Sequence, residues 1–341
     1  MSPKQKRLWI IAKSLLAAVL IAAVGWHFTK LLRHQDVWDH LTAARPEYLI
    51  PAGLLYVCAH VLWGTFWVQL MWGQGGKVSW FVGVRAYFVS QFGKYVPGKA
   101  WVIVLRVGLL RGQGMHPAVI AVTATYETLT SMAAGALIGV ILLPWTGERF
   151  GGEFGATRWV ALGIIGGMPL MVGVMHRLGA RFAKKYRAPD ARPLAIPTFR
   201  LLTQGLIQDS FGWFLLGCSL WLTVRGLTGD AVPLNPGVFC QDLAAATLSY
   251  VAGFVILVSP GGLGAREWVL QQILTPQLQP SSGAAAAGVA AVVALVLRLV
   301  WTAFEVVVAL LLFWFGRNRN PAPGTEPSEP VVIVGGTSTH G

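Results

Sequence analysis

The chain is poor in charged residues. Of its 341 residues only 12% are Asp, Glu, Lys or Arg, whereas a soluble domain carries about 25%. Apolar residues make up 55%, and long uncharged runs recur from Ser14 to Phe315. A transmembrane helix needs about 20 mostly apolar residues, and runs of that length are present. The composition therefore excludes an ordinary soluble domain and predicts an all-α, polytopic membrane protein.

Cysteine is also scarce. Cys58, Cys218 and Cys240 lie in apolar stretches and form no Cys-x-x-Cys pair, so neither a disulfide framework nor a cysteine metal site is indicated. His27 and His60 stand singly, without partners at metal-ligand spacing. We therefore expect no metal and no cofactor.

Acidic residues are about half as frequent as basic ones, 14 against 27, which gives a net charge of +13. In a soluble protein such an excess would suggest a nucleic-acid partner. In a membrane protein, Lys and Arg instead mark cytoplasmic loops and contacts with anionic headgroups. We expect no nucleic acid here, and a membrane phospholipid or another lipid as the partner.

Hydropathy predicts about six full spans. The first follows a basic start and runs longer than the roughly 7–15 apolar residues of a signal peptide, so we expect it to be retained. The six spans are expected near Leu8–Leu31, Tyr48–Trp72, Pro117–Leu143, Trp159–Met175, Leu201–Leu227 and Ala284–Phe315.

Two further apolar stretches, Ser79–Arg111 and Val238–Leu274, are interrupted by proline and glycine. Proline lacks a backbone donor, and within a bilayer such a break survives only where protein or a water-filled cavity covers the freed groups. We predict two re-entrant helical hairpins, with tips formed by Pro97, Gly98, Pro260, Gly261, Gly262 and Gly264.

The basic residues set the orientation. The N-terminus and residues 176–200 are strongly basic, which is typical of the cytoplasmic side, whereas 33–47 and 144–158 are balanced in charge. All of these charge marks are satisfied if one hairpin enters the membrane from each face. The chain then consists of a unit of two spans, one hairpin and one further span, followed by a second such unit in the opposite orientation, which is an inverted repeat. The repeats would cover about 8–143 and 159–316 of a membrane domain, 1–317, before a disordered tail, 318–341. Both termini are expected in the cytoplasm.

Several motifs resemble one family. Phe-Gly-Lys-Tyr-Val-Pro-Gly-Lys at 92–99, followed by Arg106, is similar to the hairpin motif of the lysylphosphatidylglycerol synthase transmembrane-region family. Pro260 to Glu267 resembles its Pro-Gly-Gly-x-Gly-x-Arg-Glu signature, and Tyr126-Glu127 resembles its intramembrane glutamate. Arg298 and Glu305 also fit, and the resemblance covers about residues 8–316.

The resemblance implies a flippase-like protein of the bacterial inner membrane, which moves lipid between leaflets and is not an enzyme. The soluble aminoacyl-transferring domain of those synthases has no counterpart in the sequence. We therefore do not expect this chain alone to make an aminoacylated lipid, and a partner enzyme of envelope lipid synthesis is possible.

Ten ionisable residues fall within or near the expected membrane segments. Each would cost about 2.5–3.5 kcal/mol at a helix centre, and ten facing lipid would cost on the order of 25 kcal/mol, more than a protein's whole stability. They must therefore pair, line water or extend to the surface. They are Arg85, Lys94, Lys99, Arg106, Glu127, Asp209, Arg266, Glu267, Arg298 and Glu305.

We hypothesise a polar cavity between the repeats. Its cations would hold a lipid phosphate or another anionic headgroup, and its carboxylates would pair with them or receive an ammonium group. The cations are Lys94, Lys99, Arg106, Arg266 and Arg298, and the carboxylates are Glu127, Glu267 and Glu305. As simpler alternatives, Arg85, Lys94 and Lys99 could extend to the cytoplasmic interface. Glu127 could be structural, and Asp209 could be interfacial.

Three functions remain open on the sequence. A lipid flippase comes first. A membrane-embedded enzyme on a lipid or polyprenyl phosphate, with a glutamate as base, comes second, although no aspartate-rich run and no histidine accompany the motifs. A non-catalytic scaffold for envelope synthesis is third. No Walker A loop is present, so transport would be passive or ion-coupled.

Overall fold

The computed structural model describes residues 42–95, 100–142, 177, 197–233, 235–255, 262 and 264–316. Within these ranges every regular element is helical, and five helices or helix runs are long and apolar enough to cross a membrane. The prediction of an all-helical, polytopic membrane protein is thus confirmed. The expected spans at 8–31 and 159–175, the tail, and residues 96–99, 260 and 261 lie outside the described residues.

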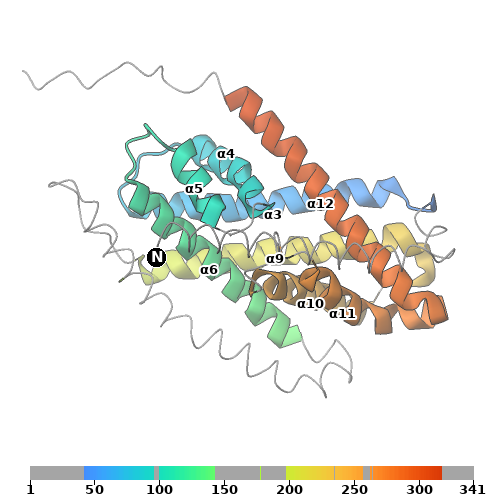
Figure 1. Ribbon diagram of the computed structural model, residues 1–341. Coiled ribbons are helices and arrows are strands. Elements are labelled where there is room, and N and C mark those ends of the chain that lie inside the picture. The colour runs from blue at the N-terminus through green and yellow to red at the C-terminus, as the bar shows by residue number, and fades with distance from the viewer. Residues whose placement is uncertain are drawn as a thin grey trace, which may run out of the picture.

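Two long helices, α3 (Pro46–Gly73) and α9 (Phe199–Thr228), run side by side through the bundle (Figure 1). Glycines let them approach closely: Gly205 faces the ring of Phe66, and Gly212 faces that of Trp63. Small residues are the usual means of close helix packing in membranes, because no hydrophobic force acts between helices there. The hydroxyl of Ser219 also donates to the carbonyl of Ala52 at 2.8 Å.

The helices α6 (Pro117–Leu142) and α10 (Pro236–Val255) pack on α9 and on each other. The indole of Trp213 on α9 donates to the carbonyl of Ser131 on α6 at 2.7 Å, and Gly135 lies against the same indole. One turn later, Gly139 faces Leu248 of α10. These contacts fix the position of α6, which forms part of the wall of the cavity described below.

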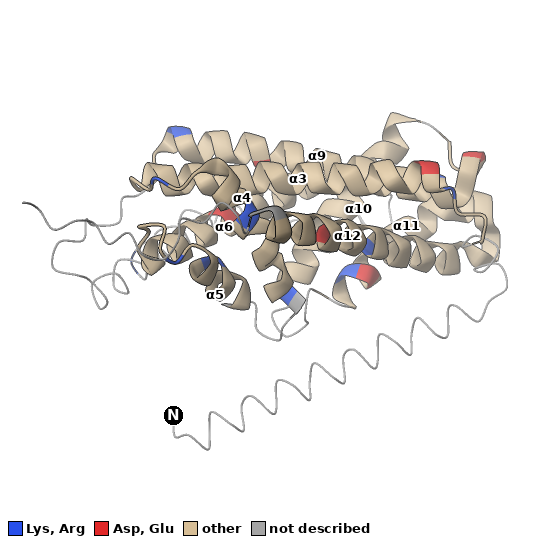
Figure 2. Cartoon of the chain, turned by 90° about the horizontal axis from the view of Figure 1, so that it is seen from above, with Lys and Arg blue, Asp and Glu red and all other residues tan. Residues whose placement is uncertain are grey.

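The C-terminal helix α12 (Ala286–Gly316) crosses α3 and α9 diagonally (Figure 1). It follows α11 (Ala265–Ser282) after the short 3-10 turn η5 (Gly283–Ala285). The indole of Trp301 donates to the hydroxyl of Ser219 at 2.8 Å, which ties α12 to α9. Seen from above, α3, α9 and α12 show long stretches without charge (Figure 2), as spans must.

The first broken segment forms two short helices, α4 (Trp80–Ser90) and α5 (Ala100–Leu109), with the 3-10 turn η1 (Gln91–Tyr95) after α4. Helices of 11 and 10 residues rise only about 15 Å each, half of the roughly 30 Å hydrocarbon core. They pack against each other. At Gly93 the backbone of η1 comes so close to that of Trp101 and Val102 that a Cβ would have no room.

The second broken segment is longer. Its arms are α10, with 20 residues, and α11, with 18, and α10 alone is long enough to cross the bilayer. Gly262 adopts φ 71° and brings the break back onto the backbone of Gly253, a conformation that favours glycine. The two broken segments therefore differ in length, and their re-entrant geometry stays a prediction.

Candidate functional site

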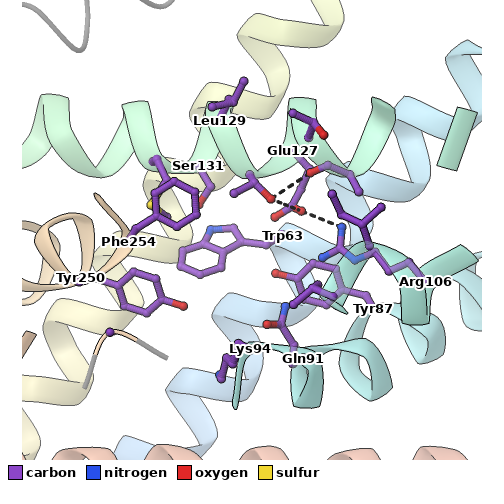
Figure 3. Close-up of a pocket in the computed structure, with 18 of the residues that line it drawn as sticks. Trp63, Tyr87, Gln91, Lys94, Arg106, Glu127, Leu129, Ser131, Tyr250 and Phe254 are labelled. Carbon is purple, nitrogen blue, oxygen red and sulfur yellow. Dashed lines mark hydrogen bonds and ion pairs between the residues drawn. The ribbon is translucent and has the colours of Figure 1, made fainter. Parts of the chain in front are cut away.

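A cavity of about 330 Å³ lies where the two broken segments meet the bundle (Figure 3). Residues of α3, α4, η1, α5, α6, α10 and α11 line it, and both breaks contribute: Lys94 comes from the first, Gly262 and Arg266 from the second. The indole of Trp63 lies near the middle of the view, between the rings of Tyr87 and Tyr250. The site thus combines broad aromatic surfaces with a few charged groups.

Arg106 and Glu127 form the most buried ion pair of the described residues. Their side chains meet at 2.9 Å and are only 2% and 5% exposed. The guanidinium lies 4.4 Å from the ring centre of Trp67 and 4.6 Å from that of Tyr87, and its Nε donates to the hydroxyl of Ser90 at 3.2 Å. A buried pair is tolerable only with such additional partners. The pair joins α5 to α6 at the cavity wall.

Lys94 and Glu305 form a second pair at 2.5 Å, joining η1 to α12. The hydroxyl of Tyr56 on α3 donates to the same carboxylate oxygen at 2.8 Å. In this arrangement the Lys94 ammonium is turned into the protein toward a carboxylate that is 1% exposed. This pairing does not support the alternative in which Lys94 extends to the cytoplasmic interface. Lys99 lies outside the described residues.

Glu267 and Arg298 form a third pair, between α11 and α12. The Glu267 carboxylate also accepts a hydrogen bond of 2.7 Å from the backbone N–H of Gly264, three residues earlier. A carboxylate in the first turn satisfies an unpaired N–H and complements the helix dipole. Glu267 therefore stabilises the N-terminus of α11 and also neutralises the charge of Arg298.

Arg266 differs from the other three cations. Its guanidinium lies 4.7 Å from the ring centre of Tyr250 and 4.3 Å from that of Trp301. Among the described residues, no carboxylate oxygen lies within ion-pair distance of it. Aromatic faces stabilise a cation without neutralising its charge. Arg266 thus has no ion-pair partner among the described residues and lines the cavities, where a ligand could reach it.

Arg266 also stands between two spaces. It lines the main cavity and a second, much smaller one of about 40 Å³. Lys94 and Tyr250 are the other residues shared by both. The small cavity is lined by Tyr56, Lys94, Tyr250, Arg266, Arg298, Trp301, Thr302 and Glu305. The two spaces are therefore neighbours, separated by an arginine.

The charges at the cavities do not cancel. We call the seven ionisable side chains here the charged cluster: Lys94, Arg106, Arg266, Arg298, Glu127, Glu267 and Glu305. Among the described residues of the cluster, three cations are matched by three carboxylates, and Arg266 is the cation left without a carboxylate partner. The cluster suits a ligand with one negative charge.

All seven members of the charged cluster, and the pairing of its carboxylates with its cations, were expected from the sequence, although the choice of partner for each carboxylate was not. The aromatic walls were not predicted, because their members are spread over separate helices. Arg85 lies buried on α4 and lines neither cavity. Asp209, for which an interfacial position was the simpler alternative, is 0% exposed. His60 is 1% exposed, as a core histidine would be.

Comparison with known proteins supports the resemblance. A family described as "Lysylphosphatidylglycerol synthase TM region" matches residues 10–302. The matched range includes both broken segments and every member of the charged cluster except Glu305. Comparison with curated proteins gave no match.

Proposed function

The chain belongs to the lysylphosphatidylglycerol synthase TM-region family, and from this premise we propose that it is a flippase-like lipid transporter. In our proposal, an anionic phospholipid headgroup passes through the charged cavity while its acyl chains stay in the bilayer. The observation that carries the proposal is the unneutralised Arg266 between the two cavities.

The physical task of such a protein is to lower the cost of moving a charged headgroup through hydrocarbon. An ionised group there costs several kcal/mol or more. A guanidinium can donate two parallel hydrogen bonds to a phosphate, and charge-assisted bonds of this kind are about twice as strong as neutral ones. Arg266 is suited to this role because no internal carboxylate competes for it in the described part of the chain.

The charge balance favours an anionic headgroup over an aminoacylated one. An added ammonium group would need a free carboxylate, and each glutamate of the charged cluster already holds a cation. A headgroup with a single negative charge, as in a phosphodiester, would neutralise the cluster. We therefore propose a monoanionic phospholipid as the substrate.

Access from both faces is part of the proposal. If the two broken segments are re-entrant and enter from opposite sides, as the charge bias predicts, their tips meet at this cavity and each can open it to one leaflet. The short α4 and α5 and the residues that both breaks give to the cavity support this view. We expect the protein in a bacterial inner membrane, where it could serve a partner enzyme of envelope lipid synthesis.

The test is leaflet exchange by the purified full chain in liposomes that contain a fluorescent phosphatidylglycerol. We expect exchange well above that of empty liposomes, and an initial rate about tenfold or more lower for Arg266→Gln, since a charge-assisted hydrogen bond is worth about 1.5–3 kcal/mol. Arg111→Gln, which removes an exposed cation just after α5, is the control and should keep the wild-type rate.

Two outcomes would contradict the proposal. Covalent change of the labelled lipid would instead indicate an enzyme. Intact lipid with no exchange, in a protein that elutes as a single folded species, would indicate a scaffold.

A further inference from the structure

Helix α9 buries a carboxyl group that has no partner. Asp209 stands near the middle of the N-terminal half of this 30-residue helix and is 0% exposed. Neither of its carboxylate oxygens has a hydrogen-bond partner among the described residues. No Lys, Arg or His of the described chain lies within ion-pair distance of it. None of the functions considered so far uses this group.

The surroundings of Asp209 are mostly apolar. From α3, the indole of Trp63 donates to the backbone carbonyl of Asp209 at 3.3 Å, and one turn before Asp209 the ring of Phe66 covers Gly205. One turn after it, Trp213 donates to the carbonyl of Ser131 on α6. Aromatic side chains of α3 and α9 therefore pack around the turn that carries Asp209.

Two titratable groups on other elements lie within electrostatic reach of Asp209. Glu127 on α6 and Asp209 on α9 each lie one turn before Ser131 and Trp213, which are hydrogen-bonded to each other, so the packing of the two helices brings the carboxyl groups near one another. The other group is Tyr87 of α4. From α3, α10 and α12, no charged side chain of the described residues acts on it. Arg106 is already paired with Glu127, so it does not neutralise Asp209.

A carboxylate in this position is left with one means of neutralisation. An isolated ionised carboxylate is so unfavourable in an apolar interior that the group takes up a proton instead. A metal ion would need several oxygen or nitrogen ligands, and the described residues contain no group of three or more His, Cys, Asp or Glu that could supply them.

We propose that Asp209 is a proton-binding site, and that its proton is linked to the charge on Glu127 of the Arg106–Glu127 pair. Any event that neutralises or displaces the Glu127 carboxylate removes a repelling charge and lets Asp209 release its proton. Glu127 lines the main cavity, so a ligand there can act on Asp209. This proton site goes beyond the proposed lipid transport, and its tests do not depend on whether the chain transports lipid.

The proton can be detected by infrared spectroscopy of the full chain in lipid, through the carbonyl stretch of a protonated carboxyl group. At neutral pH we expect an aspartic-acid band in the wild type that is lost in Asp209→Asn and retained in Asp230→Asn, whose carboxylate is 84% exposed. Asparagine matches the shape of a protonated aspartate, so the fold should tolerate it. Identical spectra for the wild type and Asp209→Asn would overturn the proposal.

A second measurement does not depend on the folding of that variant. Asp242 on α10 is the other fully buried aspartate of the described chain. In Asp242→Asn carrying aspartate labelled with ¹³C in the carboxyl group, an isotope-shifted acid band at neutral pH would belong to Asp209. Absence of this band would overturn the proposal.

The link to Glu127 is tested by the same spectra. In Glu127→Gln, the Asp209 band should disappear at a lower pH than in the wild type, because the repelling charge is gone. The control is Glu47→Gln, which removes an exposed acid from the first turn of α3 and should leave the titration unchanged. An unchanged titration in Glu127→Gln would show that the two carboxyl groups are not linked. Lipid exchange is not measured here, so failure of the proposed transport would leave these results intact.

Discussion

At the scale of single residues, the charged cluster shows how a membrane interior keeps several ionised groups. Each glutamate is held by one cation and by at least one further donor, such as Tyr56 for Glu305 or the Gly264 N–H for Glu267. This agrees with the rule that buried charges persist when they are both paired and hydrogen-bonded. Arg266 follows another rule, since ring faces take the place of a carboxylate.

The Lys94–Glu305 pair offers a stability test. Glu305→Gln leaves the Lys94 ammonium largely buried without a counter-charge, and we expect the free energy of unfolding to fall by about 3 kcal/mol. Lys94→Met together with Glu305→Gln should recover more than half of this loss, because no charge is then left unpaired. Thermal unfolding in one detergent would give both values. A double variant less stable than Glu305→Gln would contradict this account of the pair.

The choice of Lys94 as the partner of Glu305 could not be predicted from the sequence. Lys94 and Glu305 are 211 residues apart, and either could have paired with another member of the charged cluster. Hydropathy reports only that an ionisable side chain in an apolar run needs some partner. The choice of partner depends on how α12 crosses α3 and α4, which is a property of packing in three dimensions.

At the scale of elements, the apolar runs predicted the long helices well. The span expected at Pro117–Leu143 is observed as Pro117–Leu142, and that at Leu201–Leu227 as Phe199–Thr228. Such spans are set by the thickness of the hydrocarbon core, which the chain must match locally. The geometry of the broken segments was harder to predict. A Pro-Gly break shows where a helix ends, but it does not show how far the helices on either side of it reach into the bilayer.

Close contact between α3 and α9 depends on glycine. In Gly212→Ala the added methyl would meet the indole of Trp63, and we expect a loss of about 1–3 kcal/mol from overpacking. Gly108→Ala on α5 is the control, since nothing lies within 4 Å of its added methyl. Alanine there should stabilise α5 by about 0.5–1 kcal/mol. Equal effects of the two substitutions in thermal unfolding would argue against close α3–α9 packing.

At the scale of the whole molecule, the charge bias predicts that the loop between α3 and α4 faces the cytoplasm and the loop before α10 faces outside. Lys77→Cys and Asn235→Cys place one exposed thiol in each loop. With Cys58, Cys218 and Cys240 replaced by Ala, an impermeant maleimide added to intact cells should label the variant at 235 and spare the variant at 77. Labelling of both from outside would contradict the inverted arrangement.

The shared cavity is also a property of the whole molecule. Its residues come from segments between Trp63 and Arg266, so both broken segments and the long helices must be in place before it exists. The sequence predicted which charged residues would take part, because their burial needs a reason. It could not predict the aromatic walls, since tryptophan and tyrosine are also expected at both membrane interfaces.

The position of Arg266 against two rings has a consequence for speed. An anion that arrives at this guanidinium does not have to displace a carboxylate of the described residues before it can bind. When the anion leaves, no carboxylate of the described residues has to pair with Arg266 again. If the chain transports lipid as proposed, the transport rate would then be limited by the opening and closing of the surrounding helices and not by slow dissociation of the lipid from Arg266.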